Sequence, residues 1–152
     1  MATPVKAIPD GYEAVIPYLV VNDGAGAIDF YKTVFHATEI MRYEDNGKVG
    51  HAELKIGQGV FMVADEYPEM GYRGPKKGEL PAAGMMIYVE DVDATVERAL
   101  KEGATEDRPI ADQFYGDRAG GIVDPFGHRW YIATHIEDVS PEEMEKRAAA
   151  SR

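Results

Sequence analysis

Two stretches of the chain repeat the same pattern of apolar and polar positions. In each, a short apolar run rich in β-formers, residues 16–21 and 85–89, leads to an aspartate suited to capping a helix, Asp23 or Asp91. Apolar residues at helical spacing follow, namely Ala27, Ile28, Tyr31, Val34 and Phe35 in the first stretch and Val92, Val96, Ala99 and Leu100 in the second. The pattern predicts a strand followed by a helix, twice.

The spacing between the two stretches is nearly constant. Asp23 and Asp91 are 68 residues apart, and the pairs Ala37-Thr38 and Ala104-Thr105 are 67 apart. Such a fixed offset indicates a duplicated unit. The second predicted helix stops at Gly103, the usual left-handed stop, whereas the first has His36 in that place, and histidine tolerates this conformation better than most residues.

Strand-like runs separated by turn residues follow each predicted helix, so each half is expected to be β-α-β-β-β. The first module is assigned to residues 8–66 and the second to 84–137. Residues 67–83, rich in Gly, Pro and charge, are expected to link them, and their Met70 and Tyr72 either close over a cleft or lie on a surface loop. Ser140, Pro141 and Glu143 predict a capped helix over 140–150.

The composition of the sequence excludes several kinds of site and partner. The 152 residues include no cysteine, which excludes a disulfide framework, a thiolate metal site and a cysteine nucleophile. The net charge of −11, without a basic cluster, argues against nucleic-acid binding. No apolar run has the length of a signal peptide or membrane span, so we expect a cytoplasmic protein with no membrane partner. The sequence also lacks a phosphate loop, a nucleophile elbow and a dinucleotide fingerprint.

One predicted strand carries candidate chemistry. In the stretch GHAELKIG, period two separates Ala52, Leu54 and Ile56 from His51, Glu53 and Lys55. His51 and Glu53 therefore share a face, where they could act as a base and its partner, act as two metal ligands, or simply form a wetted wall.

The motifs AIDFYKTVF, HAELKIG, ADEYPEMG, YVEDVDA, DQFYGDR and DPFGHRWYIATHIEDVSPEEM, on this tandem arrangement, resemble the vicinal oxygen chelate superfamily. Within it, the chain is most similar to the PhnB-like branch of the glyoxalase and bleomycin-resistance proteins, from about Ile8 to Ala148. The resemblance implies an α+β fold in which two modules curl mixed sheets around a concave cleft, with the helices outside. It also implies a homodimer.

Metal-dependent members of this superfamily take a His or Glu from the first and last strands of each module. The resemblance places these four positions at Ile16, at Met62 or Val63, at Gly84 and at Tyr131, none of which ligates a divalent metal in the usual way. We therefore expect no metal at these positions and no cofactor.

If Tyr131 faces the cleft, alternation places Arg129 beside it and sends Trp130 and Ile132 beneath the helices. An inward Arg118 or Arg129 would bind a ligand carboxylate or phosphonate, although either could form an internal ion pair instead. The full set of expected ligand-binding residues, mostly aromatic and suited to an apolar ligand, is Tyr18, Phe61, Met86, Tyr88, Tyr115, Arg118, Arg129 and Tyr131.

Three functions compete. The leading hypothesis is a protein that binds a small aromatic or amphipathic molecule in its cleft. The alternative is a lyase, isomerase or dioxygenase with a relocated catalytic site on His51 and Glu53. A third is an interaction module whose cleft is vestigial. Whether the protein is an enzyme is left open by the sequence.

Overall fold

The computed structural model describes residues 4–152, which divide into two compact units after Gly74. The first unit contains β1 (Tyr18–Val21), α1 (Gly24–Phe35), β2 (Thr38–Asp45), β3 (Lys48–Ile56), β4 (Gly59–Asp65) and the short 3₁₀ helix η1 (Pro68–Met70). The second contains β5 (Gly84–Tyr88), α2 (Val92–Lys101), β6 (Thr105–Asp112), β7 (Asp117–Val123), β8 (Arg129–His135) and α3 (Pro141–Ala150). The expected α+β fold of two tandem β-α-β-β-β modules is confirmed.

Both units build the same mixed sheet. The strand order is β1-β4-β3-β2 in the first and β5-β8-β7-β6 in the second. In each sheet the first strand pairs in parallel with the last, and the remaining pairs are antiparallel. Identical order and direction in both halves agree with the duplication that the spacing of the sequence predicts.

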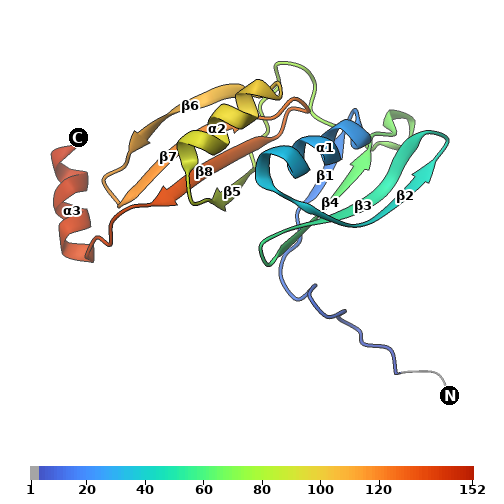
Figure 1. The fold of residues 1–152 in the computed structure, drawn as a ribbon, viewed down its shortest axis with the longest axis horizontal. Helices are drawn as coiled ribbons and strands as arrows, with labels where there is room; N and C mark the ends of the chain where they lie inside the picture. Colours follow the sequence, from blue (N-terminus) through green and yellow to red (C-terminus); the bar gives the residue numbers. More distant parts are fainter. Residues whose placement is uncertain (1–3) are drawn as a thin grey trace. The chain divides into compact units, whose positions relative to one another are not determined.

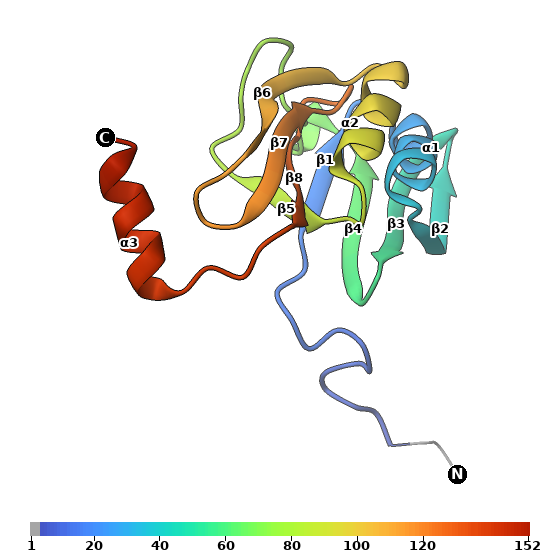
Figure 2. The same ribbon diagram turned by 60° about the vertical axis from the view of Figure 1, so that its left-hand side comes forward.

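Each module has one helix on one face of its sheet (Figures 1 and 2). The helix α1 packs on β3 and β4, and α2 packs on β7 and β8. Asp23 and Asp91 cap these helices as expected, by accepting hydrogen bonds from the amides of Gly26 and Ala94 at 3.0 Å each. Among residues 4–152, no helix of the same module covers the opposite face of either sheet, which is called the open face below.

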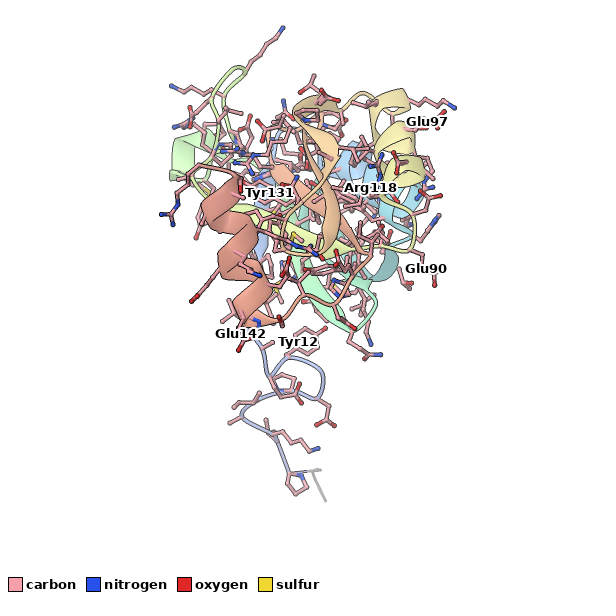
Figure 3. All side chains as sticks on the ribbon, turned by 90° about the vertical axis from the view of Figure 1, so that its left-hand side faces the viewer. Tyr12, Glu90, Glu97, Arg118, Tyr131 and Glu142 are labelled. Atoms are coloured by element: carbon pink, nitrogen blue, oxygen red, sulfur yellow. The ribbon has the colours of Figure 1, made fainter. Side chains whose placement is uncertain are left out.

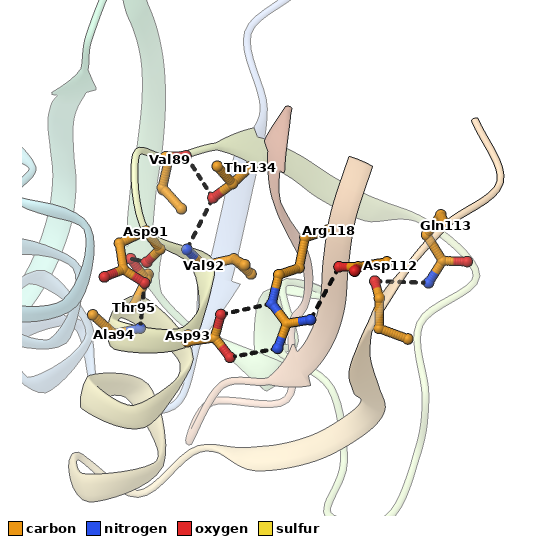
Figure 4. Close-up of polar contacts among 11 residues, drawn as sticks. Val89, Asp91, Val92, Asp93, Ala94, Thr95, Asp112, Gln113, Arg118 and Thr134 are labelled. Carbon is orange, nitrogen blue, oxygen red and sulfur yellow. Dashed lines mark hydrogen bonds and ion pairs between the residues drawn. The ribbon is translucent and has the colours of Figure 1, made fainter. Parts of the chain in front are cut away.

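The end of α1 confirms the left-handed stop expected at His36, which has φ 57° and ψ 36°. At the beginning of each helix, a side chain from the end of the last strand of the module holds the first backbone N–H. Asp65 accepts a bond from Gly24 N at 2.8 Å, and Thr134 accepts one from Val92 N at 2.9 Å (Figure 4). These bonds satisfy helix donors that would otherwise lack partners.

Asp65 also accepts a second bond, from Val49 N at 2.7 Å, so both of its carboxylate oxygens are used inside the first unit. Glycine is required at position 24, because a Cβ there would lie 2.8 Å from the Val49 side chain and 2.9 Å from Asp65 Oδ2. The buried Asp65 thus ties α1, β3 and β4 together at one end of the sheet.

The hairpin between β7 and β8 is organised by another buried carboxylate. Gly127 N donates to Asp124 O at 3.0 Å, which closes the turn, and Gly127 adopts a φ of 94° that favours glycine. The Asp124 side chain accepts bonds from the amides of Phe126 and His128 and from the indole of Trp130. The sequence motif therefore builds a rigid connection that fixes the tryptophan.

The C-terminal helix α3 begins at the expected Ser140 cap, which accepts a bond from Glu143 N. The Glu143 carboxylate pairs with Arg147 instead of returning to the cap. Arg147 also binds Glu137 and the Phe114 carbonyl, which attaches α3 to the second unit. None of the helices in residues 4–152 has the length and apolar character that a membrane crossing requires.

Candidate functional site

On the open face of the first sheet, His51 and Glu53 lie side by side on β3, as the alternation predicts. His51 Nε2 lies 2.8 Å from Glu53 Oε2, and His51 Nδ1 lies 3.2 Å from the Tyr18 hydroxyl on β1. Tyr12, from the segment before β1 (Figure 3), donates its hydroxyl to Glu53 Oε1. The four side chains form one continuous chain of polar contacts, Tyr12–Glu53–His51–Tyr18.

The pKa values of three of these four side chains are shifted from their ordinary values. Hydrogen bonds from Tyr12 and His51 lower the pKa of Glu53, and the hydrogen bond to Glu53 raises the pKa of the Tyr12 phenol. Burial, followed by the proximity of Tyr72, raises the pKa of Tyr18. In the tautomer that donates Nε2–H to Glu53, the Nδ1 atom of His51 accepts a hydrogen bond from the Tyr18 hydroxyl. His51 thus holds Tyr18 in place through its phenolic oxygen.

A pocket of about 570 Å³ opens next to Tyr18 within the first unit. Its aromatic and sulfur-containing lining consists of Tyr18, Tyr67, Met70 and Tyr72, and the remaining lining residues are Val20, Asp45, Gly50, Ala64 and Asp65. The backbones of Tyr67 and Tyr72 pair as an isolated antiparallel bridge on either side of η1. This bridge fixes the conformation of residues 67–72, which form one wall of the pocket. The segment expected to be a linker therefore places Met70 and Tyr72 at this pocket.

On the open face of the second sheet, a second series of polar contacts is centred on Asp117. This carboxylate accepts bonds from the Tyr88 hydroxyl at 2.7 Å and from His135 Nδ1 at 2.8 Å, and His135 Nε2 lies 2.7 Å from Asp138. Burial would raise the pKa of Asp117, but the bonds from His135 and Tyr88 outweigh it and lower that pKa. Asp117 and Asp138 raise the pKa of His135.

Tyr131, expected on the cleft side, lies on this open face, opposite Met86 in the pairing of β5 with β8. Its ring is flanked by two guanidinium groups. The Cζ atoms of Arg129 and Arg108 lie 5.6 and 6.0 Å from the centroid of the Tyr131 ring. Arg129 also binds the Asp107 carboxylate at 2.8 Å, which is the internal ion pair that the sequence left as an alternative. The side chains of Met86, Tyr88 and Tyr115 are all exposed and can therefore contact a ligand on the second unit.

The expectation that Phe61 faces the cleft is wrong. Phe61 is only 5% exposed and packs edge-on against Tyr31 of α1, with ring centroids 5.5 Å apart. The pairing of β1 with β4 explains the error, because Tyr18 lies opposite Met62 and therefore shares the open face with Met62. Phe61 and Val63 belong to the face under the helix.

The expectation that Arg118 enters the cleft is also wrong. Arg118 points to the helix side of the second sheet, where its guanidinium forms a forked pair with Asp93 of α2 at 2.8 and 2.9 Å and a third bond to Asp112 (Figure 4). Alternation assigns its neighbour Asp117 to the open face instead. Arg118 thus fastens α2 to β6 and β7.

The same register separates Met62 from Val63, the two positions on β4 that the resemblance to metal-dependent relatives left open. Met62 lies on the open face, whereas Val63 is fully buried beneath α1. With Met62 in that place, the expected positions Ile16, Met62, Gly84 and Tyr131 offer no carboxylate or imidazole for a divalent metal. Across residues 4–152 no three His, Cys, Asp or Glu side chains are grouped so that they could hold a metal ion.

Several residues of these sites were missed by sequence reasoning. Tyr12 precedes the first strand and Tyr67 lies in the expected linker, so neither belongs to a periodic pattern. His135 and Asp117 were not among the expected site residues. A signal for Asp117 did exist, because its parity on β7 matches the open-face positions opposite Tyr131 and His135.

The fold and the two open faces can now be compared with known proteins. Residues 13–132 match the model of the Glyoxalase/Bleomycin resistance protein/Dioxygenase superfamily. This match spans most of both modules, so the chain belongs to that superfamily.

Individual relatives agree with this assignment. An uncharacterized protein of Mycobacterium bovis is 40% identical over 136 residues, which cover 87% of this chain and 90% of the relative. Among solved structures, TioX from a Micromonospora species is 27% identical, with a TM-score of 0.63, over 82% of this chain and 99% of that one. A PhnB protein from Bacillus cereus shares the fold at 19% identity and a TM-score of 0.62, over 80% and 99% of the two chains.

Proposed function

We propose that the protein binds a small aromatic or amphipathic molecule in the pocket of its first unit. The observation that carries the proposal is the pocket of about 570 Å³, in which Tyr18, Tyr67, Tyr72 and Met70 present apolar surface beside a few polar groups. Its volume lies in the range of small-molecule sites, and its mixed lining is typical of them. The chain Tyr12–Glu53–His51–Tyr18 supports the wall that Tyr18 forms.

Binding in this proposal needs no metal at the ancestral positions, since aromatic walls and fixed polar groups supply the contacts. The motifs described above and the shared fold with the Bacillus PhnB protein support membership of the PhnB-like branch. Ligand contacts from Met86, Tyr88, Tyr115, Arg129 and Tyr131 of the second unit stay predictions, as do the homodimer and the cytoplasmic location.

A ligand screen by thermal shift tests the proposal, because a ligand that binds only the folded protein raises its melting temperature. For any hit, Tyr72→Ala should weaken binding about tenfold, since a ring that a bound molecule covers contributes about 1 to 2 kcal/mol to binding. Leu100→Ala, an exposed apolar change on α2, is the control. A broad screen without any stabilising compound would contradict the proposal.

A second candidate is an enzyme, a lyase, isomerase or dioxygenase, whose site is built on His51 and Glu53. One observation favours it: the carboxylate–imidazole pair reaches the pocket through the Tyr18 hydroxyl. Glu53 would orient His51, and His51 would take the Tyr18 proton when the phenol acts on a bound molecule. Tyr18 would be the group that contacts the substrate.

Turnover assays of the purified protein, with elemental analysis for zinc, nickel, manganese and iron, test this candidate. His51→Ala should abolish turnover. Glu53→Gln should reduce turnover and change its pH profile, because the neutral glutamine side chain cannot supply the negative charge that the glutamate places beside the imidazole. If His51→Ala turns over every accepted substrate as fast as the unmodified protein does, the catalytic role of this pair is excluded.

A further inference from the structure

We propose that the molecule bound in the first-unit pocket carries a positive charge, as an alkylated ammonium or basic amine attached to an apolar body. This inference rests on the proposed function and adds the chemical class of the ligand. It is drawn from the charges and rings around the pocket, all of which belong to residues 18–72.

The lining is chemically one-sided. Three of its residues are tyrosines, whose ring faces carry partial negative charge, and two are aspartates, Asp45 and Asp65. No lysine, arginine or histidine is among the residues that line it. A cluster of ring faces with nearby carboxylates is the arrangement that attracts alkylated ammonium groups. The same lining repels an anion and gives a neutral molecule no electrostatic gain.

The protein already uses one of these rings to hold a cation. The ammonium nitrogen of Lys48 lies 4.6 Å from the centroid of the Tyr67 ring, and it also donates to the Glu66 carbonyl at 3.2 Å. Tyr67 therefore has the geometry of a cation–π acceptor. Lys48 is itself a positive charge at this end of the sheet, although it is not among the lining residues, and it sets a limit on the affinity for a cation.

The two aspartates have different roles. Asp65 is buried, and both of its oxygens are engaged by backbone N–H groups, so it contributes its negative charge but no free acceptor. Asp45 is exposed at the end of β2, and within residues 4–152 no hydrogen bond or ion pair engages its carboxylate. Asp45 is therefore the carboxylate available to a ligand cation.

Three phenols of the same shape separate charge from size. Their para substituents, trimethylammonium, tert-butyl and sulfonate, are tetrahedral groups of similar volume with charges of plus one, zero and minus one. Calorimetric titration of the full chain should give an affinity for the trimethylammonium phenol about tenfold above that for tert-butylphenol, with the sulfonate binding weakest. If tert-butylphenol or the sulfonate binds as tightly as the cation, the inference is overturned while the proposed function stands.

If none of the three phenols gives saturable binding, the result counts against both the inference and the proposed function. Where the cation does bind, Asp45→Asn should weaken it about three- to tenfold and leave tert-butylphenol unchanged. The matched control is Asp29→Asn, an equal change of charge at an exposed position of α1, the helix on the other face of the sheet. Equal losses in both variants would overturn the assignment of the charge effect to the pocket.

The aromatic part has its own comparison. Tyr72→Phe keeps a ring and should retain the preference for the cation, whereas Tyr72→Leu keeps apolar volume without a ring. The leucine variant should lose about two- to fivefold in affinity for the cation and little for tert-butylphenol. A leucine variant that retains the full preference for the cation would show that the Tyr72 ring is not part of the recognition.

Discussion

The indole N–H of Trp130 donates to the buried carboxylate of Asp124 at 2.9 Å, six residues earlier in the chain. The other oxygen of Asp124 accepts the amides of Phe126 and His128, at 2.9 and 3.0 Å. One side chain thus closes the β7–β8 hairpin and sets the position of an aromatic ring that is only 3% exposed under α2.

Replacing Asp124 by Ala should therefore destabilise the protein by about 3 kcal/mol, because one buried and two part-buried donors lose their carboxylate acceptor. Urea unfolding followed by the fluorescence of Trp130, the single tryptophan, measures the loss. Glu90→Gln, at an exposed carboxylate labelled in Figure 3, serves as the control and should change stability little. A midpoint for Asp124→Ala equal to that of the control would show that the hairpin does not depend on these bonds.

The position of Phe61 leads to a prediction that separates folding from binding. Phe61→Ala should cost about 3 to 4 kcal/mol of stability, since the ring is buried against Tyr31 in the core under α1. Met62→Ala, next in the chain but on the open face and partly exposed, should cost about 1 kcal/mol. Denaturant titrations of the two variants compare them directly, and a smaller loss for Phe61→Ala would contradict the assignment of faces.

Arg118 gives a prediction of the opposite kind. Arg118→Met should leave ligand affinity unchanged, because the guanidinium binds Asp93 and Asp112 on the helix side of its sheet. The ion pairs are exposed and screened by solvent, so the loss of stability should be small. Ligand titration and thermal melting of the same variant provide both measurements. A loss of affinity without a loss of stability would return Arg118 to the binding site.

His135 should titrate above its ordinary range, since Asp117 and Asp138 raise its pKa. A raised pKa in the folded state means that His135 contributes stability fully below its unfolded pKa of about 6.5, and that this contribution is lost as the pH rises through the folded value. NMR titration of the imidazole measures the folded pKa. Asp117→Asn should lower it, and an unchanged titration in that variant would rule out the carboxylate as the cause.

The sequence predicted the architecture well because the fold follows from periodicity. The two copies of the strand-and-helix pattern, the caps at Asp23 and Asp91 and the left-handed stop at His36 are all local features, and the structure confirms them. His51 and Glu53 were also placed correctly, since alternation along a regular strand fixes which side chains share a face.

The site was predicted less completely because parity within one strand does not give the register between strands. Phe61 and Arg118 were both included among the expected ligand-binding residues, and only the pairing with neighbouring strands corrects both assignments. Tyr67 and Tyr72 face each other across an irregular turn, and Tyr12 reaches Glu53 over 41 residues of sequence. Contacts of these kinds leave no periodic trace in the chain.

Asp65 connects the lining of the pocket to the first turn of α1, because this buried residue lines the pocket and its carboxylate accepts hydrogen bonds from the amides of Gly24 and Val49. These two amides therefore act as a built-in reporter of occupancy. A ligand that restrains Asp65 in the pocket wall should slow the hydrogen exchange of the Gly24 and Val49 amides with solvent deuterium, without contacting either amide.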